Sequence, residues 1–172
     1  RGERFAQRRR RQLRRAADPD PIFTTELIAL TAWHRARVEV ARTHHLGPLE
    51  LRPRVRVGWG EDLPVQQTFA LGGLDGFAGL RMQERRGSQE AYGSLLFRWP
   101  LWRRVLGRVE PMVGAIGNGP GFLTRRGTPD GEVLIGVRMG VELDTPVGPI
   151  RVEQGFNNLG RREALIRVGY WF

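Results

Sequence analysis

Residues 132–144 alternate between apolar and polar side chains with a period of two, and one of the two resulting faces carries no charge. That period is typical of a β-strand, in which successive side chains point to opposite faces. The charge-free face consists of Val133, Ile135, Val137, Met139, Val141 and Leu143. The other face combines glycines with Arg138 and Glu142, and Leu134 is its one apolar residue. The polar face is too charged to pack in a protein core. The apolar face must therefore be covered by something apolar on the opposite side of the sheet.

Six further segments alternate in the same way, and none has a convincing helical period. The clearest are 49–59, 90–101 and 163–172, and weaker ones are 28–40, 109–116 and 150–156. Short connectors between several of them favour antiparallel pairing. The sequence therefore predicts an all-β fold with about seven antiparallel strands.

The lengths of strands and connectors favour a transmembrane β-barrel over a soluble β-sandwich. Several segments reach the roughly 9 to 11 residues that a tilted strand needs to cross a bilayer. Connectors 44–48, 101–107 and 144–149 are short, whereas 61–87 and 117–132 are long, and only the short connector 157–163 breaks this alternation. Membrane barrels have short turns on the periplasmic side and long loops outside. Aromatic residues lie near strand ends, where a membrane girdle belongs, at Trp99, Trp102, Tyr170, Trp171 and Phe172.

Seven strands cannot close such a barrel, since bacterial single-chain barrels have an even number of strands and at least about eight. Open sheet edges are not tolerated in lipid. We therefore expect further strands of the same chain before Arg1, or several chains that complete one barrel; the absence of an initial Met favours the first.

An acidic substitution at Val137 or Val168 is expected to impair membrane assembly more than one at Arg138.

The composition sets two further limits. The net charge is +10, and all 28 basic residues are arginine. There is no cysteine, and no apolar stretch is long enough for a transmembrane helix. We expect residues 1–22 to be an Arg-rich loop or disordered segment and residues 23–172 to be the C-terminal part of the barrel. The alternative is a soluble basic β-protein that binds nucleic acid through its arginines.

The segment "LPVQQTFALGGLDGFAGLRMQERRG", residues 63–87, contains five glycines. Glycine permits positive φ and close backbone approach. Such a loop could fold inward against other backbone, and the alternative is a flexible outer loop.

The order "LP…LGG…GFAGLR…RG", "FRWPL", "DTPVGPIRV" and "ALIRVGYWF" resembles the C-terminal barrel of the bacterial surface antigen family, over residues 49–172. That family includes outer-membrane assembly factors, translocation barrels and barrels fused to patatin-like phospholipases. The resemblance implies a sixteen-stranded outer-membrane barrel whose long loop enters the lumen. It assigns a lumen-loop motif to Gly72, Gly73, Gly76, Phe77, Gly79, Leu80 and Arg81. It also assigns an insertion signal, read by the outer-membrane assembly machinery, to Tyr170 and Phe172.

The chain departs from the assembly factors at three matched positions. Ala78 stands where the family's loop-tip arginine would be, and Leu96 and Gly114 stand where its acidic partners would be. Loss of all three charges together is coherent, because a lone buried charge is costly. The motifs are therefore more similar to the barrels attached to patatin-like phospholipases.

No residue pattern in this chain predicts catalysis or a cofactor. There is no Gly-x-Ser-x-Gly motif, and the three histidines, His34, His44 and His45, have no third ligand at metal-binding spacing. We therefore expect no enzyme activity in this chain; a lipolytic domain could precede it. The expected role is to anchor a protein in the outer membrane or to form a pore or assembly barrel there. The expected partners are outer-membrane lipid and the missing strands or domain of the same chain, and nucleic acid is not favoured.

Overall fold

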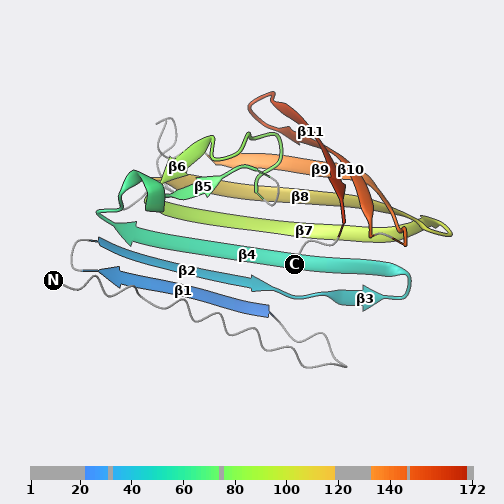
Figure 1. Ribbon diagram of the computed structural model, residues 1–172, viewed down its shortest axis with the longest axis horizontal. Coiled ribbons are helices and arrows are strands. Elements are labelled where there is room, and N and C mark those ends of the chain that lie inside the picture. Colours follow the sequence, from blue (N-terminus) through green and yellow to red (C-terminus); the bar gives the residue numbers. More distant parts are fainter. Residues whose placement is uncertain (1–21, 31–32, 74–75, 119–132, 147, 170–172) are drawn as a thin grey trace.

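The computed structural model describes residues 22–30, 33–73, 76–118, 133–146 and 148–169. Within them the fold is all-β, with one large antiparallel sheet and a small two-stranded sheet. Eight strands follow one another across the large sheet in chain order (Figure 1). These are β1 (Ile22–Leu30), β2 (Trp33–Ala41), β4 (Leu49–Glu61), β7 (Gln89–Trp102), β8 (Val105–Gly117), β9 (Leu134–Leu143), β10 (Ile150–Asn157) and β11 (Arg162–Val168).

Shorter elements complete the described fold. Strand β3 (His44–Leu46) pairs with the beginning of β4 through a tight turn at Gly47. The connection from β4 to β7 contains the short 3-10 helix η1 (Val65–Gln67) and the small sheet of β5 (Phe69–Leu71) and β6 (Arg85–Gly87). We call residues 62–88 the long loop.

The predicted alternation is confirmed in most strands, but the segment 28–40 is not one strand. It is divided between β1 and β2, which form an antiparallel hairpin with Leu30 opposite Trp33. The sequence between them, "LTAW", lacks the Gly, Pro, Asn or Asp that usually marks a tight turn. The described sheet therefore has one long strand more than predicted.

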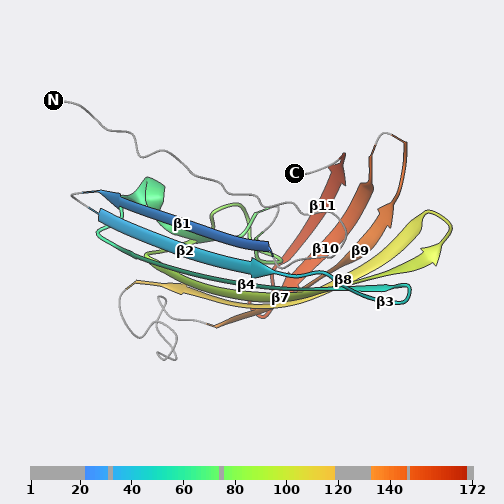
Figure 2. The same cartoon turned by 90° about the horizontal axis from the view of Figure 1, so that it is seen from below.

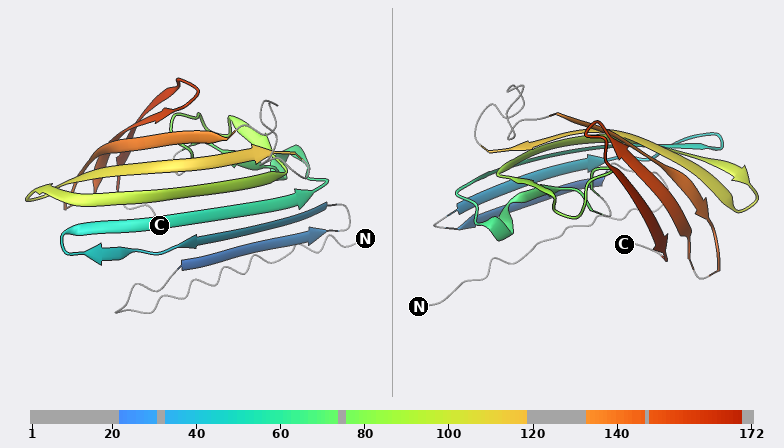
Figure 3. Two further views of the ribbon diagram at one scale, coloured as in Figure 1. Left: turned by 180° about the vertical axis from the view of Figure 1, so that it is seen from behind. Right: turned by 90° about the horizontal axis from the view of Figure 1, so that it is seen from above.

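The large sheet is strongly curved. Strands β9, β10 and β11 bend away from the plane of β1, β2 and β4, and the long loop lies on the concave side (Figures 2 and 3). We call the concave side the inner face and the convex side the outer face. Among the described residues β1 and β11 are the two edges of the sheet, and each pairs with one neighbour.

Burial in this sheet is the reverse of burial in a soluble protein. The outer face exposes apolar side chains that include Val55, Val57, Trp59, Val113, Ile135, Met139, Val141, Leu143, Val152, Ile166 and Val168. The inner face buries the charged side chains Arg56, Glu90, Arg108, Glu110, Arg138, Glu142, Glu153 and Arg167. The alternation thus places charge inside and aliphatic surface outside.

A compact apolar cluster lies between the long loop and one half of the inner face. The loop contributes Phe69, Leu71, Phe77, Ala78 and Leu80, and the strands contribute Tyr92, Met112, Ile116 and Leu134. Phe77 meets Tyr92 edge to face, with ring centroids 6.4 Å apart. The described core therefore lies between the loop and the inner face of a one-layered sheet.

Candidate functional site: the charged inner face and its loop

The carboxylate of Glu90 on β7 is fully buried and is shared by two arginines. Arg37 Nε on β2 lies 2.7 Å from Glu90 Oε1, and Arg56 Nη2 on β4 lies 3.3 Å from Glu90 Oε2. The guanidinium of Arg37 also lies 5.4 Å from the ring centre of Phe69, and that of Arg56 lies 4.9 Å from the ring centre of Tyr92. Such contacts offset the desolvation of buried charges, because each ion has an opposite charge and an aromatic face beside it.

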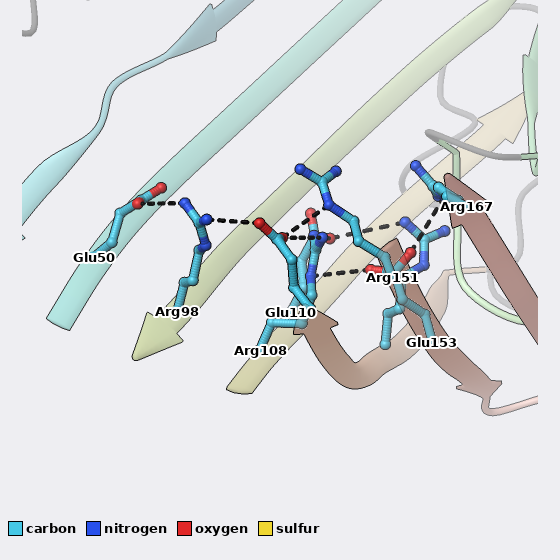
Figure 4. Close-up of polar contacts among 9 residues, drawn as sticks. Glu50, Arg98, Arg108, Glu110, Arg151, Glu153 and Arg167 are labelled. Carbon is cyan, nitrogen blue, oxygen red and sulfur yellow. Dashed lines mark hydrogen bonds and ion pairs between the residues drawn. The ribbon is translucent and has the colours of Figure 1, made fainter. Parts of the chain in front are cut away.

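A second cluster centres on Glu142 of β9. Its carboxylate accepts from Arg98 Nη2 at 2.6 Å and from Arg151 Nε at 2.8 Å. Arg98 Nη1 also donates to Glu50 on β4 at 3.0 Å (Figure 4). Ion pairs therefore run from β4 through β7 and β9 to β10 without a break.

The same network continues to the last described strand. Arg108 Nε on β8 lies 3.0 Å from Glu153 Oε1 on β10, and Arg167 Nε on β11 lies 3.3 Å from Glu153 Oε2 (Figure 4). Arg138 lies 3.8 Å from Glu110. Each of these glutamates would be an uncompensated buried charge without its arginines, so the network fixes the relative placement of neighbouring strands.

Glycines on the inner face make room for the loop. A Cβ added to Gly58 would lie 2.6 Å from the Phe69 ring, and one added to Gly136 would lie 2.8 Å from the Phe77 ring. A Cβ at Gly155 would lie 2.8 Å from the backbone nitrogen of Gly79. We call these residues, with Gly114, the glycine trough. Only residues without a side chain allow the loop to approach the strands this closely.

Three polar contacts fasten the tip of the loop to the sheet. Arg138 Nη2 donates to the carbonyl oxygen of Gly76 at 3.0 Å. Asn157 Nδ2 donates to the carbonyl oxygen of Ala78 at 3.2 Å. The backbone nitrogen of Ala78 lies 3.0 Å from the sulfur of Met112. Further along the loop, Glu84 forms an ion pair with Arg161 in the β10–β11 turn. Strands β8, β9 and β10 thus hold one loop tip.

Six residues of the predicted lumen-loop motif lie in this packed segment, and the seventh lies at its surface. Phe77 and Leu80 are fully buried, and Gly72, Gly73 and Gly79 adopt positive φ, which favours glycine. Gly76 is buried against the backbone of Gly72. Arg81 is exposed, and its backbone nitrogen donates to Glu84 Oε2 at 2.8 Å.

Other sequence predictions fall on different parts of the chain. Tyr170 and Phe172, and residues 1–21 of the Arg-rich segment, lie outside the described residues. His34, His44 and His45 are all exposed. Arg138, Asn157 and Met112 were not predicted as loop contacts, and their only local signal is their place on a glycine-rich polar face. Phe69, which lies in the long loop itself, was not predicted to be buried there.

The matched positions Ala78 and Gly114 lie at the loop contact. Ala78 is fully buried, and a Cβ added to Gly114 would lie 3.2 Å from the ring of Phe77. An acidic side chain at position 114 would therefore need the space that Phe77 fills. The apolar tip and the small residue opposite it are sterically consistent with one another.

Replacing Asn157 by alanine is expected to lower the free energy of unfolding by about 1 to 2 kcal/mol, because it removes the bond to the Ala78 carbonyl. Asn157 Oδ1 also accepts from the backbone nitrogens of Leu159 and Arg161. Asn157→Asp keeps those acceptors but places a carboxylate oxygen opposite the Ala78 carbonyl oxygen, so it is also expected to lower the stability. Urea unfolding of the two variants measures the difference, and equal stability of Asn157→Ala and wild type would contradict the assigned contact.

Among the described residues, no group of three or more His, Asp or Glu side chains is placed to hold a metal ion. None of the helices formed by those residues has the length and apolar character of a membrane-crossing helix. No protein-family model and no curated protein matches this chain.

Proposed function

We propose that this chain is a portion of a transmembrane β-barrel in the bacterial outer membrane, with its outer face in lipid and its inner face lining the lumen. The observation that supports this most directly is the reversed burial of the sheet. Ile135, Val141 and Ile166 are 60%, 45% and 73% exposed, whereas Glu90 is fully buried. In water that arrangement would leave a large apolar surface without a partner, whereas in a bilayer it is the favourable one.

The distance between aromatic residues on the outer face fits a bilayer. Trp59 lies opposite Gln89 at one end of β7, and Trp99 lies near its other end. Ten residues of strand between these levels span about 33 Å, and a tilt of roughly 40° reduces this to about 25 Å across the membrane. An apolar band of about 25 Å between two aromatic girdles is characteristic of outer-membrane barrels.

Closure of the barrel requires strands beyond those described. Unpaired N–H and C=O groups at β1 and β11 would be costly in hydrocarbon, so further strands must cover them. The resemblance to the bacterial surface antigen family supplies a candidate arrangement of sixteen strands. The long loop would then occupy the lumen, where its polar contacts with Arg138 and Asn157 hold it to the wall.

Membrane anchoring of a patatin-like phospholipase is the specific role that we propose, ahead of protein insertion. The loop tip is apolar at Phe77 and Ala78 and faces Gly114, so the charged contact of assembly factors is replaced by packing. Binding of nucleic acid is less well supported. Many inner-face arginines already pair with glutamates, among them Arg37, Arg56, Arg98, Arg108, Arg138, Arg151 and Arg167.

Single cysteines test the proposed faces, since the chain has none of its own. With a spin label at Val55 or Val141 on the outer face, we expect faster collision with oxygen than with a water-soluble nickel chelate. With the label at Arg52 on the inner face, we expect the opposite order. A label at Gln66 in η1 of the long loop is the control, because this position is exposed to water in either arrangement.

The measurement uses the complete protein that carries this chain, in native membranes or reconstituted vesicles. Nickel accessibility at Val55 and Val141 as high as at Gln66 would place the outer face in water. That result would refute the membrane proposal.

A further inference from the structure

The edge of the sheet that carries the short turns has exposed arginines. It comprises the connection from β2 to β4, the β7–β8 turn and the β9–β10 turn, and we call it the turn edge. Arg103 and Arg104 are exposed there. Neither of the two forms an ion pair with another described residue. Asp144 is close, but its contact is from its backbone nitrogen to the carbonyl oxygen of Arg104.

Apolar side chains stand directly beside these arginines. Trp102 is 76% exposed and precedes Arg103 in the chain, and Leu101 is 55% exposed. The β7–β8 hairpin extends past the end of the β4 pairing, where Arg98 lies opposite Glu50, so the last residues of β7 pair only with β8. The hairpin tip thus presents an indole and two guanidinium groups together.

Three arginines at the opposite edge make contacts within the chain, whereas Arg81 there is exposed. Arg161 pairs with Glu84, and Arg86 donates to the carbonyl oxygen of Val65. The guanidinium of Arg162 lies 5.7 Å from the ring centre of Phe156. Free positive charge beside exposed tryptophan is therefore a property of the turn edge among the described parts of the sheet.

We propose that the turn edge binds the headgroup of an anionic glycerophospholipid through Arg103 and Arg104, with Trp102 at the level of the glycerol backbone. This inference rests on the proposed membrane function and adds a lipid class and an orientation to it. Guanidinium groups match phosphate oxygens in a bidentate geometry. Tryptophan favours the membrane interface, where its ring is in apolar surroundings and its N–H reaches water. The turn edge would then face the phospholipid leaflet.

The expected selectivity follows from the number of arginines. Each arginine near an anionic surface contributes about 1 kcal/mol, or roughly a fivefold preference, so two give about thirtyfold at most. The complete protein, purified in a detergent with phosphatidylcholine, is titrated with phosphatidylglycerol, and lipid retention is measured by native mass spectrometry. Arg103→Gln with Arg104→Gln is expected to reduce phosphatidylglycerol affinity by tenfold to thirtyfold and to leave phosphatidylcholine retention unchanged.

Arg81→Gln is the matched control, because Arg81 is exposed on the long loop at the other end of the sheet. It is expected to keep wild-type affinity for phosphatidylglycerol. Equal loss in both variants would show a non-specific charge effect and overturn the proposal. Wild-type protein with no preference for phosphatidylglycerol over phosphatidylcholine would overturn it as well, whether because the site is absent or because another part of the protein covers it.

A lipopolysaccharide titration separates the two sources of anionic lipid. Stronger retention of lipopolysaccharide that depends on Arg103 and Arg104 would place the turn edge in the other leaflet and contradict the proposed orientation. The spin-label experiment tests the membrane proposal separately, because it compares oxygen and nickel accessibility at Val55 and Arg52. If the variant with both arginines replaced does not fold, Arg104→Gln alone is expected to lose about fivefold.

Discussion

Leu95→Arg is expected to lower the free energy of unfolding of the membrane-embedded protein by about 2 to 4 kcal/mol. Leu96→Arg is expected to lower it by less than about 1 kcal/mol. The two leucines are neighbours in the middle of β7 and point to opposite faces. Leu95 lies on the outer face, where the guanidinium would enter hydrocarbon. Leu96 lies on the inner face, opposite Arg52 and one step from the ion-pair network. Both substitutions are chemically identical and lie at the same depth.

Urea unfolding in lipid vesicles, followed by the gel mobility of unheated samples, measures both variants. Leu95→Met serves as a control for changes in side-chain shape on the outer face and should be neutral. Equal destabilisation by arginine at the two positions would contradict the assignment of faces. The predicted comparison of Val137 or Val168 with Arg138 also changes a loop contact, because Arg138 is buried and donates to the loop, so Leu96 is the better inner-face reference.

Replacing Phe77 by alanine is expected to cost about 3 to 5 kcal/mol of the free energy that holds the loop in place. Phe77 is fully buried between Gly114 and Gly136 and contacts Tyr92 edge to face. The glycines that surround it have no side chains with which to fill the resulting cavity. The loop is therefore expected to detach from the inner face while the strands remain paired.

Trypsin cleavage at Arg81 or Arg86 of the loop reports this detachment. The Phe77→Ala variant should be cut much faster than wild type, with unchanged cleavage elsewhere. Met82→Ala is the matched control, since Met82 is 69% exposed on the same loop and should change stability by less than about 0.5 kcal/mol. A loop that stays resistant without Phe77 would show that the polar contacts alone hold it.

The sequence predicted the strands well because their signal is local. In β9 every second residue from Ile135 to Leu143 has the same character, and the structure places all of them on the outer face. The β1–β2 hairpin was missed because its turn has ordinary residues and because alternation continues across it. Register and chain order in a simple meander then follow from short connections.

The loop contacts could not be predicted from local sequence patterns. The bond from Arg138 to Gly76 joins residues 62 positions apart, and that from Asn157 to Ala78 joins residues 79 apart. Arg138 pairs with Glu110 and also binds the loop, and nothing near it in the sequence distinguishes it from Arg98 or Arg151, which bind Glu142. The glycines at 58, 114, 136 and 155 were visible as a feature of the polar face. What they accommodate became clear only from the path of the loop.

The match between the glycine trough and the loop aromatics constrains how relatives of this chain can diverge. A larger residue at position 136 collides with the Phe77 ring, and a smaller residue at 77 leaves a void over the bare backbone. Neither change is easily accepted alone, so the two positions are expected to vary as a pair across homologous sequences. A larger side chain at position 136 should be accompanied by a smaller one at position 77. The same relation is expected between positions 58 and 69.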